Sequence, residues 1–262
     1  MKLVCELHKL SKILTIDAGN TRVKWGLFNA EGMLLENGAS LNTAISQTKL
    51  PAANRIIISN VAGLHIRNQL ESILPKGVSN YWITAKADEC GVKNCYEQPD
   101  KLGTDRWAAI IAAWHTKQAP SVVVNAGTAV TIDALNENGE FIGGMILPGI
   151  DLMQQSLGVA AAQLPTITSE KSESAVNNLY QYIFAKNTAD AMRAGAINAA
   201  CGAIMQMHAA LTIQCKKTPY IFISGGNAQL IKDNLLGDVT NLALIVDNLV
   251  LRGLYLIENF AP

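Results

Sequence analysis

Hydrophobic positions at the start of the chain fall into short runs separated by turn residues. Residues 13–17 are mainly apolar and lead into Asp-Ala-Gly-Asn-Thr, a sequence typical of a turn. Residues 22–28 resume as a strand, and residues 33–36 follow a second turn at Glu31-Gly32. The pattern predicts a meander of three β-strands.

The next segments alternate between strand-like and helix-like patterns. Residues 55–59 form a β-branched run without alternation, as expected of a strand that is buried on both faces. Residues 81–84 predict a short strand, and residues 105–117 predict a helix rich in Ala, Ile and Trp. Residues 64–74 predict another helix. Its apolar face is predicted to consist of Leu64, Leu70, Ile73 and Leu74.

The opening pattern then recurs. Residues 121–125 form a β-branched run that ends in Asn-Ala-Gly-Thr, residues 130–135 resume as a strand, and residues 140–146 follow an Asn-Glu-Asn-Gly turn. Asn125 follows Asp17 by 108 residues, close to half of the chain. Self-similarity of this kind predicts two related structural units.

The rest of the second half is richer in helix. It predicts helices at residues 149–164, 188–211, 228–236 and 248–259, and strands at residues 220–224 and 242–246. Together with the recurrence, this pattern predicts an α/β fold with two related domains, residues 1–118 and residues 119–262, and a cleft between them.

Composition narrows the classes of function. Of the 262 residues 49% are hydrophobic, and 21 Lys and Arg balance 21 Asp and Glu, so no net charge favours nucleic acid or an anionic membrane. No apolar stretch reaches the roughly 18 residues of a membrane span, and the charged start does not suit a signal peptide. Five scattered cysteines without a CxxC pair indicate reduced thiols, and the four histidines lack metal-ligand spacing. These features predict a cytoplasmic protein.

The first candidate site is the turn that begins at Asp17. A carboxylate at a strand end can hold Mg²⁺, and the N–H groups of a glycine turn can bind phosphate oxygens. Asn20 and Thr21 add hydrogen bonds, and Lys24 adds positive charge. Alone, the motif is equally compatible with an ordinary hairpin turn.

The second glycine turn, from Asn125 to Ala129, strengthens the case. Two turns of one form, one in each half, can face each other and grip a triphosphate. The chain lacks GxxxxGK[ST], and it lacks a GxGxxG that opens a helix after a strand. The pair of turns is therefore the better candidate for nucleotide binding.

The segment Gly103-Thr104-Asp105-Arg106 is the third candidate. Thr104 or Asp105 could simply cap the helix that follows. An arginine at a helix start, however, is poorly placed against the helix dipole unless an anion binds there. A substrate carboxylate would suit this position.

Several motifs in their order along the chain resemble one family, the type III pantothenate kinases, which include the Bvg accessory factor-like proteins. The family belongs to the actin, hexokinase and Hsp70-like ATPase superfamily. The resemblance covers residues 13–254. Its motifs are IDAGNTRVKWG, Tyr96 with LGTDRW, NAGTAVTID, GGMILPG, NT with MRAG, SGGN and LVLRGL.

The resemblance implies two actin-like (ribonuclease H-like) domains with a nucleotide cleft between them. It also implies transfer of the ATP γ-phosphate to pantothenate, the first step of coenzyme A biosynthesis, with Mg²⁺ as cofactor. Asp105 would be the general base, and Asp17 would hold Mg²⁺. The ATP-binding residues would be Asp17, Gly19, Asn20, Thr21, Lys24, Gly127 and Thr128. The pantothenate-binding residues would be Tyr96, Gly103, Thr104, Asp105, Arg106 and Thr188.

Further roles follow from the same resemblance. Thr188 would reach the pantothenate site from the partner subunit of a homodimer, although it could equally cap a helix. Tyr96 would line the pantothenate pocket, although its ring could simply pack on the core. The loops at Gly143-Gly144 and Pro148-Gly149 would lie near the phosphates, and the loop 224–227 would lie near the adenosine.

The chain departs from the family pattern at two places. Most family members have Asp at the position of Asn125, where the Asp is linked with a monovalent cation (K⁺ or NH₄⁺), so a cation requirement is doubtful here. A dozen residues precede Ile13, where the family motif usually begins near the N-terminus.

Two alternatives stay open. One is a non-catalytic transcription-accessory protein on the same scaffold, and the other is a kinase of a sugar or carboxylate from the same superfamily.

Overall fold

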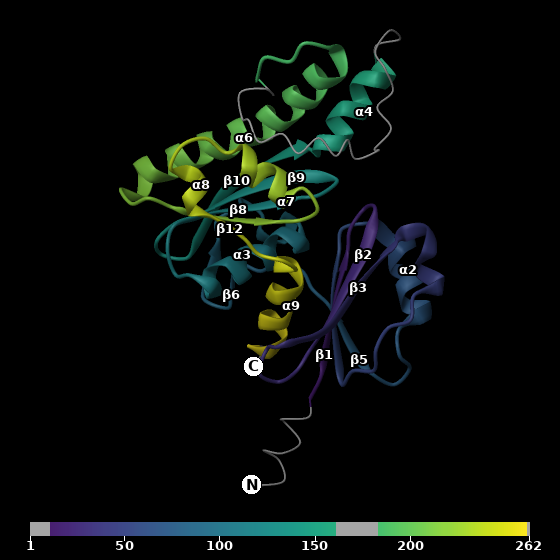
Figure 1. The fold of residues 1–262 in the computed structure, drawn as a ribbon. Helices are drawn as coiled ribbons and strands as arrows, with labels where there is room; N and C mark the ends of the chain where they lie inside the picture. Colours follow the sequence, from purple (N-terminus) through teal and green to yellow (C-terminus); the bar gives the residue numbers. More distant parts are fainter. Residues whose placement is uncertain (1–10, 161–182, 261–262) are drawn as a thin grey trace. The chain divides into compact units, whose positions relative to one another are not determined.

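A computed structural model of the chain describes residues 11–160 and 183–260 (Figure 1). The predictions that concern residues 1–10, Cys5, His8 and the end of the helix at 149–164 lie outside the described residues. The chain folds into two compact units. Unit 1 comprises Met1–Gln118, Gly139–Phe141 and Asn248–Pro262, and unit 2 comprises Ala119–Asn138 and Ile142–Asp247.

Unit 1 is built on a five-stranded sheet with the strand order β3-β2-β1-β4-β5. β1 is antiparallel to β2 and parallel to β4, and β4 is parallel to β5. The strands of this sheet are β1 (Ile13–Ala18), β2 (Arg22–Phe28), β3 (Leu34–Leu41), β4 (Arg55–Asn60) and β5 (Ser79–Trp82). Two short strands of unit 1, β6 (Asp88–Glu89) and β7 (Val92–Asn94), belong to the other sheet. The helices are η1 (Asn42–Gln47), α2 (Gly63–Ile73), η2 (Pro99–Lys101), α3 (Thr104–Thr116) and α9 (Leu249–Asn259).

Alternation along β1 and β4 divides the side chains of unit 1 between two faces of the sheet. Leu14 and Ile16 pack with Ile56 and Ile58 in a core closed by α2 and η1. The other face, which carries Asp17, is covered by α3 and α9. Figure 1 shows α2 and α9 on opposite faces of this sheet.

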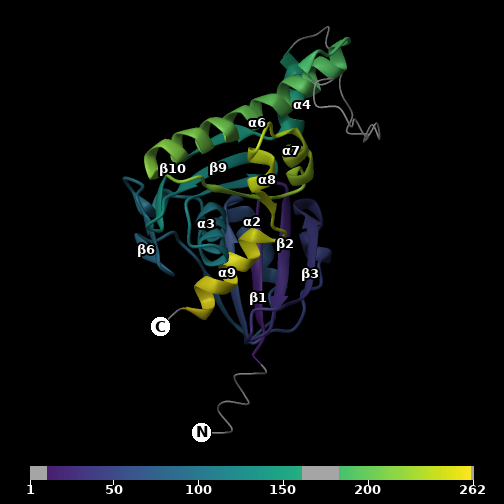
Figure 2. The same cartoon turned by 60° about the vertical axis from the view of Figure 1, so that its left-hand side comes forward.

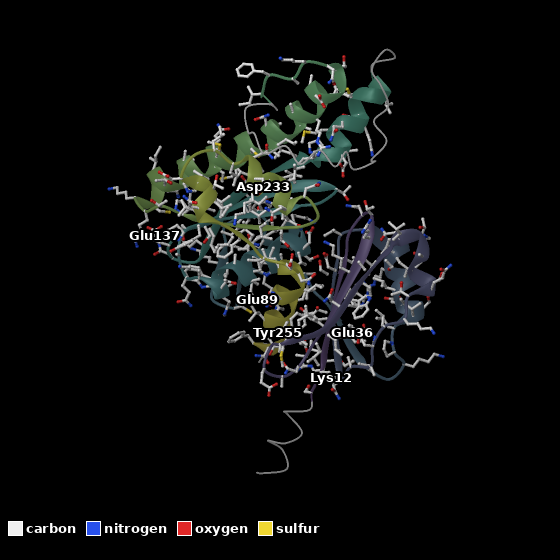
Figure 3. The ribbon with its side chains drawn as sticks, viewed as in Figure 1. Lys12, Glu36, Glu89, Glu137, Asp233 and Tyr255 are labelled. Carbon is white, nitrogen blue, oxygen red and sulfur yellow. The ribbon has the colours of Figure 1, made fainter. Side chains whose placement is uncertain are left out.

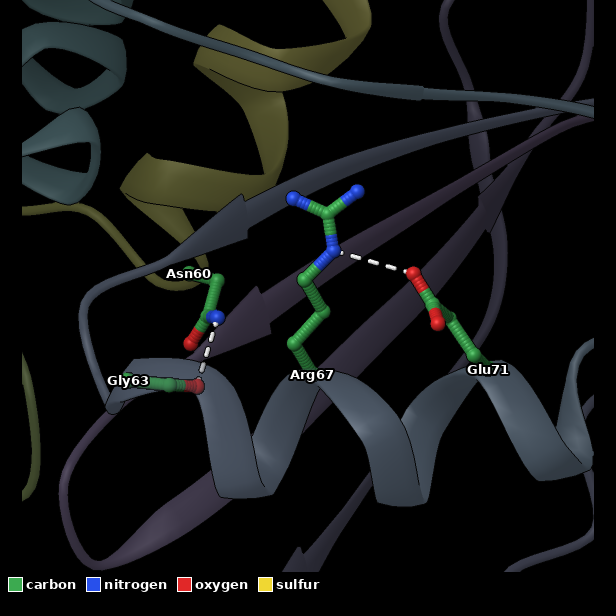
Figure 4. A network of polar contacts seen from close by, with 4 residues as sticks. All are labelled: Asn60, Gly63, Arg67 and Glu71. Carbon is green, nitrogen blue, oxygen red and sulfur yellow. Dashed lines mark hydrogen bonds and ion pairs between the residues drawn. The ribbon is translucent and has the colours of Figure 1, made fainter.

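The connection from β4 to α2 is fixed by side chains at its start (Figure 4). Asn60 accepts a hydrogen bond from the N–H of Ala62 and donates one to the carbonyl of Gly63. One turn later Arg67 pairs with Glu71 at 2.9 Å. These contacts hold the carboxyl end of β4, which lies beside the carboxyl end of β1.

Unit 2 contains strands in the order β12-β11-β8-β9-β10. Its strands are β8 (Ser121–Ala126), β9 (Ala129–Leu135), β10 (Glu140–Pro148), β11 (Tyr220–Ser224) and β12 (Ala243–Ile245). Its helices are α4 (Ile150–Ala160), α6 (Thr188–Cys215), α7 (Ala228–Asn234) and α8 (Val239–Leu242). The first two residues of β10 belong to unit 1, where they pair with β7.

The two units repeat one topology. In unit 1 a strand (β1) pairs with an antiparallel neighbour (β2) and with a parallel one (β4). In unit 2, β8 pairs with the antiparallel β9 and the parallel β11 in the same order. The internal repeat predicted from the two glycine turns is therefore present in the topology.

The described elements differ from the predicted ones in a few places. The predicted helix 64–74 forms, and Leu70 is buried as predicted. Leu64 is 71% exposed, because Ile66 takes its place on the buried face. The short strands β6 and β7 and the two 3₁₀ helices were not predicted, because runs of two to six residues carry no periodicity. The predicted second domain included the closing helix α9, whereas the compact units place it in unit 1.

The long helix α6 lies on β8 and β9 in unit 2 (Figure 2). By length and hydropathy alone it could cross a membrane, and within the described parts of the chain no second helix meets that test. Ala196, Ile197, Ala200 and Ile204 of α6 are buried in the core of unit 2. Because the core helix of a globular unit meets the same test, this is weak evidence for a span.

Helix α9 packs on the rest of unit 1 through a close approach to α3, a hydrogen bond and an ion pair. Gly253 of α9 lies so near α3 that a Cβ atom built on it would be 1.8 Å from the carbonyl oxygen of Ala108. Tyr255 donates a hydrogen bond of 2.8 Å to the carbonyl of Ala30, and Glu258 forms an ion pair with Arg55. A residue without a side chain is therefore required at the crossing of α9 and α3.

We expect Gly253→Ala to destabilise unit 1 by about 3 kcal/mol or more, because backbone atoms of α3 cannot move aside without repacking the helix pair. Urea unfolding followed by circular dichroism measures the effect. Gly202→Ala is the matched control, because a Cβ there meets no atom within 4 Å and the helix α6 gains about 0.5–1 kcal/mol. Equal stability of the two variants would contradict the close approach.

Candidate active site

A row of three polar side chains crosses the carboxyl end of β1. Asp17 is paired with Lys24 across the antiparallel neighbour and with Ser59 across the parallel one. Residues directly opposite each other in a sheet project from the same face. All three therefore lie on the face that α3 and α9 cover.

Asp17 is the acid of this row, and its surroundings shift its pKa strongly. Its residue is 8% exposed, and one carboxylate oxygen, Oδ1, is buried without a hydrogen-bond partner among the described residues. Burial, together with the nearby charge of Asp105, raises the pKa of Asp17 from 3.8 to about 7, while Lys24 acts in the opposite direction. A buried carboxylate with a free oxygen next to a second carboxylate fits a divalent cation.

The start of α3 lies over this row. The hydroxyl groups of Ser59 and Thr104 are 2.8 Å apart and share a hydrogen bond. The N-cap of α3 is Gly103 and no side chain makes a cap hydrogen bond, so the alternative that Thr104 or Asp105 acts as a cap is wrong. A Cβ on Gly103 would be 2.7 Å from Oδ1 of Asp105, so a side chain at this position would displace the Asp105 carboxylate.

Asp105 stands in the first turn of α3. Its Oδ1 accepts a hydrogen bond of 2.8 Å from the N–H of Arg106. Burial raises the pKa of Asp105, and the hydrogen bond and charge of Arg106 oppose the shift. A carboxylate with a raised pKa is a better proton acceptor than a solvated one, which suits a general base.

Arg106 is buried against a pair of aromatic rings. It donates a hydrogen bond of 2.9 Å to the hydroxyl of Tyr96, and its guanidinium carbon lies 5.6 Å from the Tyr96 ring centre and 5.8 Å from that of Phe141. The two rings themselves are 5.1 Å apart. The ring of Tyr96 packs on Phe141 and its hydroxyl holds the arginine, so the packing interpretation is confirmed and the role in a pantothenate pocket stays a prediction.

The first glycine turn is closed by its own backbone. The N–H of Gly19 donates to the carbonyl of Arg22 at 3.1 Å. The side-chain amide of Asn42 donates to the carbonyls of Gly19 and Asn20, each at 2.9 Å. The N–H of Gly19 is therefore engaged within the turn, and Asn20 and Thr21 are exposed at its tip.

The second glycine turn, in unit 2, is one residue shorter and is closed in a similar way. The N–H of Gly127 donates to the carbonyl of Ala129 at 3.0 Å. Gly149 and Gly225 pack on this turn so closely that a Cβ on either would lie 2.4 Å from a carbonyl oxygen, of Gly127 and of Ala126 respectively. The predicted loops at Pro148-Gly149 and 224–227 therefore meet at the second turn.

Asn125 occupies the position in β8 that Asp17 occupies in β1. It pairs with Thr131 across β9 and with Ser224 across β11. This second row is neutral, because an amide and two hydroxyls replace a carboxylate, a lysine and a serine.

Thr188 is the first residue of α6 and is exposed. The cap of this helix is Asn187, whose side chain accepts a hydrogen bond from the N–H of Asp190 at 2.9 Å. Thr188 is thus not required as a cap, and its hydroxyl is placed at the surface of unit 2.

The described residues contain no group of three or more His, Cys, Asp or Glu that could hold a metal ion by itself. Mg²⁺ is usually bound by one or two carboxylates together with substrate phosphates. The pair Asp17 and Asp105 meets that lesser requirement.

Sequence reasoning missed three residues that shape the site. Ser59 holds the start of α3, Asn42 holds the first turn, and Phe141 stacks on Arg106. Only Ser59 carried a usable signal, because it ends a buried strand parallel to that of Asp17. The other two are joined to the site by contacts across the fold that no local pattern contains.

Comparisons with known proteins agree with one another. A family model described as type III pantothenate kinase matches residues 13–210. A type III pantothenate kinase from Nitrosospira multiformis is 39% identical over 92% of this chain and 89% of its own length. One from Aromatoleum aromaticum is 40% identical over 92% and 96%.

Solved structures show the fold. A Baf family protein from Campylobacter jejuni superposes with a TM-score of 0.57 at 23% identity and covers 93% of this chain and 96% of its own. Component A of the (R)-2-hydroxyglutaryl-CoA dehydratase from Acidaminococcus fermentans gives a TM-score of 0.50 at 13% identity and covers 96% and 97%. The predicted α/β class with two related actin-like domains is confirmed.

The raised pKa of Asp17 predicts a pH-dependent stability. Below pH 4 the carboxyl is protonated in both the folded and the unfolded chain, whereas between pH 4 and 7 only the unfolded chain ionises. Wild type therefore loses stability over this interval relative to Asp17→Asn, by at most roughly 4 kcal/mol.

Urea unfolding at pH 4, 6 and 8, with a chelator present, measures this difference. Addition of Mg²⁺ at pH 8 is expected to stabilise wild type and to leave Asp17→Asn unchanged. A difference in stability that does not vary with pH would show that the folded chain does not hold Asp17 protonated.

Proposed function

The chain belongs to the family of type III pantothenate kinases, and on this premise we propose that it transfers the γ-phosphate of ATP to pantothenate, giving 4′-phosphopantothenate for coenzyme A biosynthesis. The observation that carries the proposal is the placement of Asp105 and Arg106 in the first turn of α3, above the buried Asp17. We expect the enzyme to act in the cytoplasm.

Pantothenate offers a carboxylate at one end and a primary hydroxyl at the other. Arg106 and Tyr96 bind the carboxylate in this proposal, with Gly103 and Thr104 beside it. Asp105 accepts the proton of the hydroxyl as its oxygen attacks the γ-phosphate. Proton removal is a modest part of phosphoryl transfer, so the positioning of the two substrates supplies most of the acceleration.

The phosphates of ATP are bound by the two glycine turns in this proposal. Lys24 supplies a positive charge, and Asn20, Thr21 and Thr128 supply hydrogen bonds. Because the N–H groups of Gly19 and Gly127 close their own turns, these glycines contribute shape rather than donors. Asp17 would hold Mg²⁺, which when bound neutralises charge on the phosphate oxygens.

A monovalent cation stays a separate prediction. Asn125, Thr131 and Ser224 offer neutral oxygens from three adjacent strands. K⁺ or NH₄⁺ could be coordinated there without a charged ligand, and weak binding is expected. Activity should then depend little on either ion.

We further propose that the enzyme is a homodimer whose contact involves α4 and the start of α6. The two helices pack together around a cavity of about 290 Å³ that is lined by Met153, Leu157 and Met192 among others. Helix α4 and the segment that precedes α6 also carry apolar side chains that are 43% to 89% exposed, namely Leu152, Leu157, Val159, Ile183 and Phe184. Thr188, which the partner subunit is expected to contribute to the pantothenate site, comes four residues after Phe184.

The alternatives make different demands on the site. A transcription-accessory protein without catalysis needs neither a buried base nor a buried arginine, and a sugar substrate offers no carboxylate to Arg106. A coupled assay of ADP release separates the three, because only the proposed reaction requires pantothenate.

Asp105→Asn is expected to lower the turnover number by about 10² to 10⁴-fold while the protein stays folded, because the amide cannot accept the proton. The coupled assay, with and without pantothenate, measures this. Asp100→Asn is the matched control, since Asp100 is exposed on η2 and should leave turnover unchanged. Near wild-type turnover in Asp105→Asn would remove the residue from the role of base.

Val159→Glu is expected to convert the dimer to a monomer, because it places a charge in the proposed contact. Light scattering after size exclusion measures the mass, and the KM for pantothenate should rise since Thr188 of the partner would be lost. Ile213→Glu, at a residue 79% exposed near the other end of α6, should stay dimeric. A dimeric Val159→Glu would place the contact elsewhere.

A further inference from the structure

Asn94, at the end of β7, is a buried amide that sequence reasoning did not single out. It is 5% exposed. Its side-chain oxygen accepts a hydrogen bond of 3.1 Å from the N–H of Tyr96, and its side-chain nitrogen donates one of 3.1 Å to the carbonyl of Pro99. Both polar ends of one buried side chain are thus used, as is usual for an amide that shapes a loop.

These two hydrogen bonds tie together both ends of one loop. The loop begins at Tyr96, whose hydroxyl is bonded to Arg106. It continues through Pro99, whose carbonyl also accepts the N–H of Leu102 at 3.2 Å, and leads directly into Gly103. Asn94 therefore fixes the two segments that present Tyr96 and the start of α3.

Asn94 itself is anchored to the scaffold of unit 1. Its N–H donates to the carbonyl of Ala87 at 2.8 Å, and it pairs with Phe141 where β7 meets β10. The neighbouring Cys95 donates its N–H to the carbonyl of Phe141 at 3.0 Å. The ring that stacks on Arg106 and the amide that holds Tyr96 are thus adjacent in one strand pair.

The hairpin that carries Asn94 is also docked on α3. Glu89, labelled in Figure 3, accepts a hydrogen bond of 2.8 Å from the indole N–H of Trp107. The carbonyl of Cys90 is 2.8 Å from Nε2 of His115, which lies about two turns after Trp107 in α3. Since α3 carries Arg106, these hydrogen bonds connect the hairpin to the helix that positions the arginine.

We propose that Asn94 is a positioning residue for the acceptor substrate: it sets Tyr96 against Arg106 without contacting pantothenate. This rests on the proposed function. Asparagine suits the position because one end must accept and the other must donate. Aspartate would keep the acceptor for Tyr96 but would place a second carboxylate oxygen against the carbonyl of Pro99.

The kinetic test compares Asn94→Ala and Asn94→Asp with wild type in the coupled assay of ADP release. We expect the KM for pantothenate to rise about tenfold in each variant, while the KM for ATP and the turnover number at saturation stay within about threefold. Asn29→Ala is the matched control. The side chain of Asn29 accepts a comparable local hydrogen bond, from the N–H of Met33, just after the end of β2 that is remote from the first glycine turn. It should leave both constants unchanged.

A second readout does not depend on activity. Lys101, in η2, has a side chain that is 69% exposed and accessible to trypsin. Loss of the two Asn94 bonds should loosen the loop and accelerate cleavage after Lys101 several-fold in both variants, but not in Asn29→Ala. If Asn94→Ala does not fold, Asn94→Asp, which keeps one bond, decides the matter.

The outcomes separate the two proposals. An active wild type with an unchanged KM for pantothenate in both Asn94 variants overturns the positioning role alone. An equal rise in the KM for both substrates also overturns it, because a general loosening of the fold would then explain the effect. A wild type without pantothenate-dependent ADP release overturns the proposed function and, with it, the role of Asn94 toward pantothenate.

Discussion

The candidate site of unit 1 is built around one buried carboxylate, that of Asp17, which lies close to a second, that of Asp105. Burial removes water from the Asp17 carboxylate, and the charge of Asp105 adds to the effect, so the pKa of Asp17 rises to about 7. The fold tolerates this because the cross-strand Lys24 offsets part of the repulsion. One oxygen of Asp17 is still left without a partner among the described residues. In the proposed function, a divalent cation held by Asp17 would offset the like charges and give the unpartnered oxygen a ligand bond.

Such a strained pair persists only if the surrounding structure holds it firmly. The start of α3 is held from below by the hydrogen bond between Thr104 and Ser59. Further along, α3 is held by α9, which approaches so closely at Gly253 that no side chain fits. A side chain on the first turn of a packed helix is placed more accurately than one on a free loop. The closing helix, remote in sequence, is thus part of what positions Asp105.

Local patterns were sufficient for most elements and for the repeat, because strands ending in glycine turns leave a clear signature. The turn at Asp17 and its counterpart at Asn125 could be matched by sequence, and strand register then explains why both face a parallel neighbour. Two kinds of feature could not be predicted. Asn42 and Phe141 act through partners far away in the chain. The engagement of the Gly19 N–H within its own turn depends on backbone geometry that a motif does not contain.

The row at Asp17 and the row at Asn125 occupy equivalent positions in the two sheets, but their side chains differ in charge. The difference indicates that the two turns have different roles. Lys24 and Asp17 give the first row both charges, whereas Thr131 and Asn125 give the second row none. The second turn is instead enclosed by backbone, since both Gly149 and Gly225 contact it where no Cβ fits. A neutral turn enclosed by backbone can define the shape of a phosphate site but cannot bind a divalent cation strongly. The repeated hairpin thus has the same strand pairing in both halves but carries charge in one, so the charged groups that the proposed phosphoryl transfer would use lie in the unit that also carries Asp105.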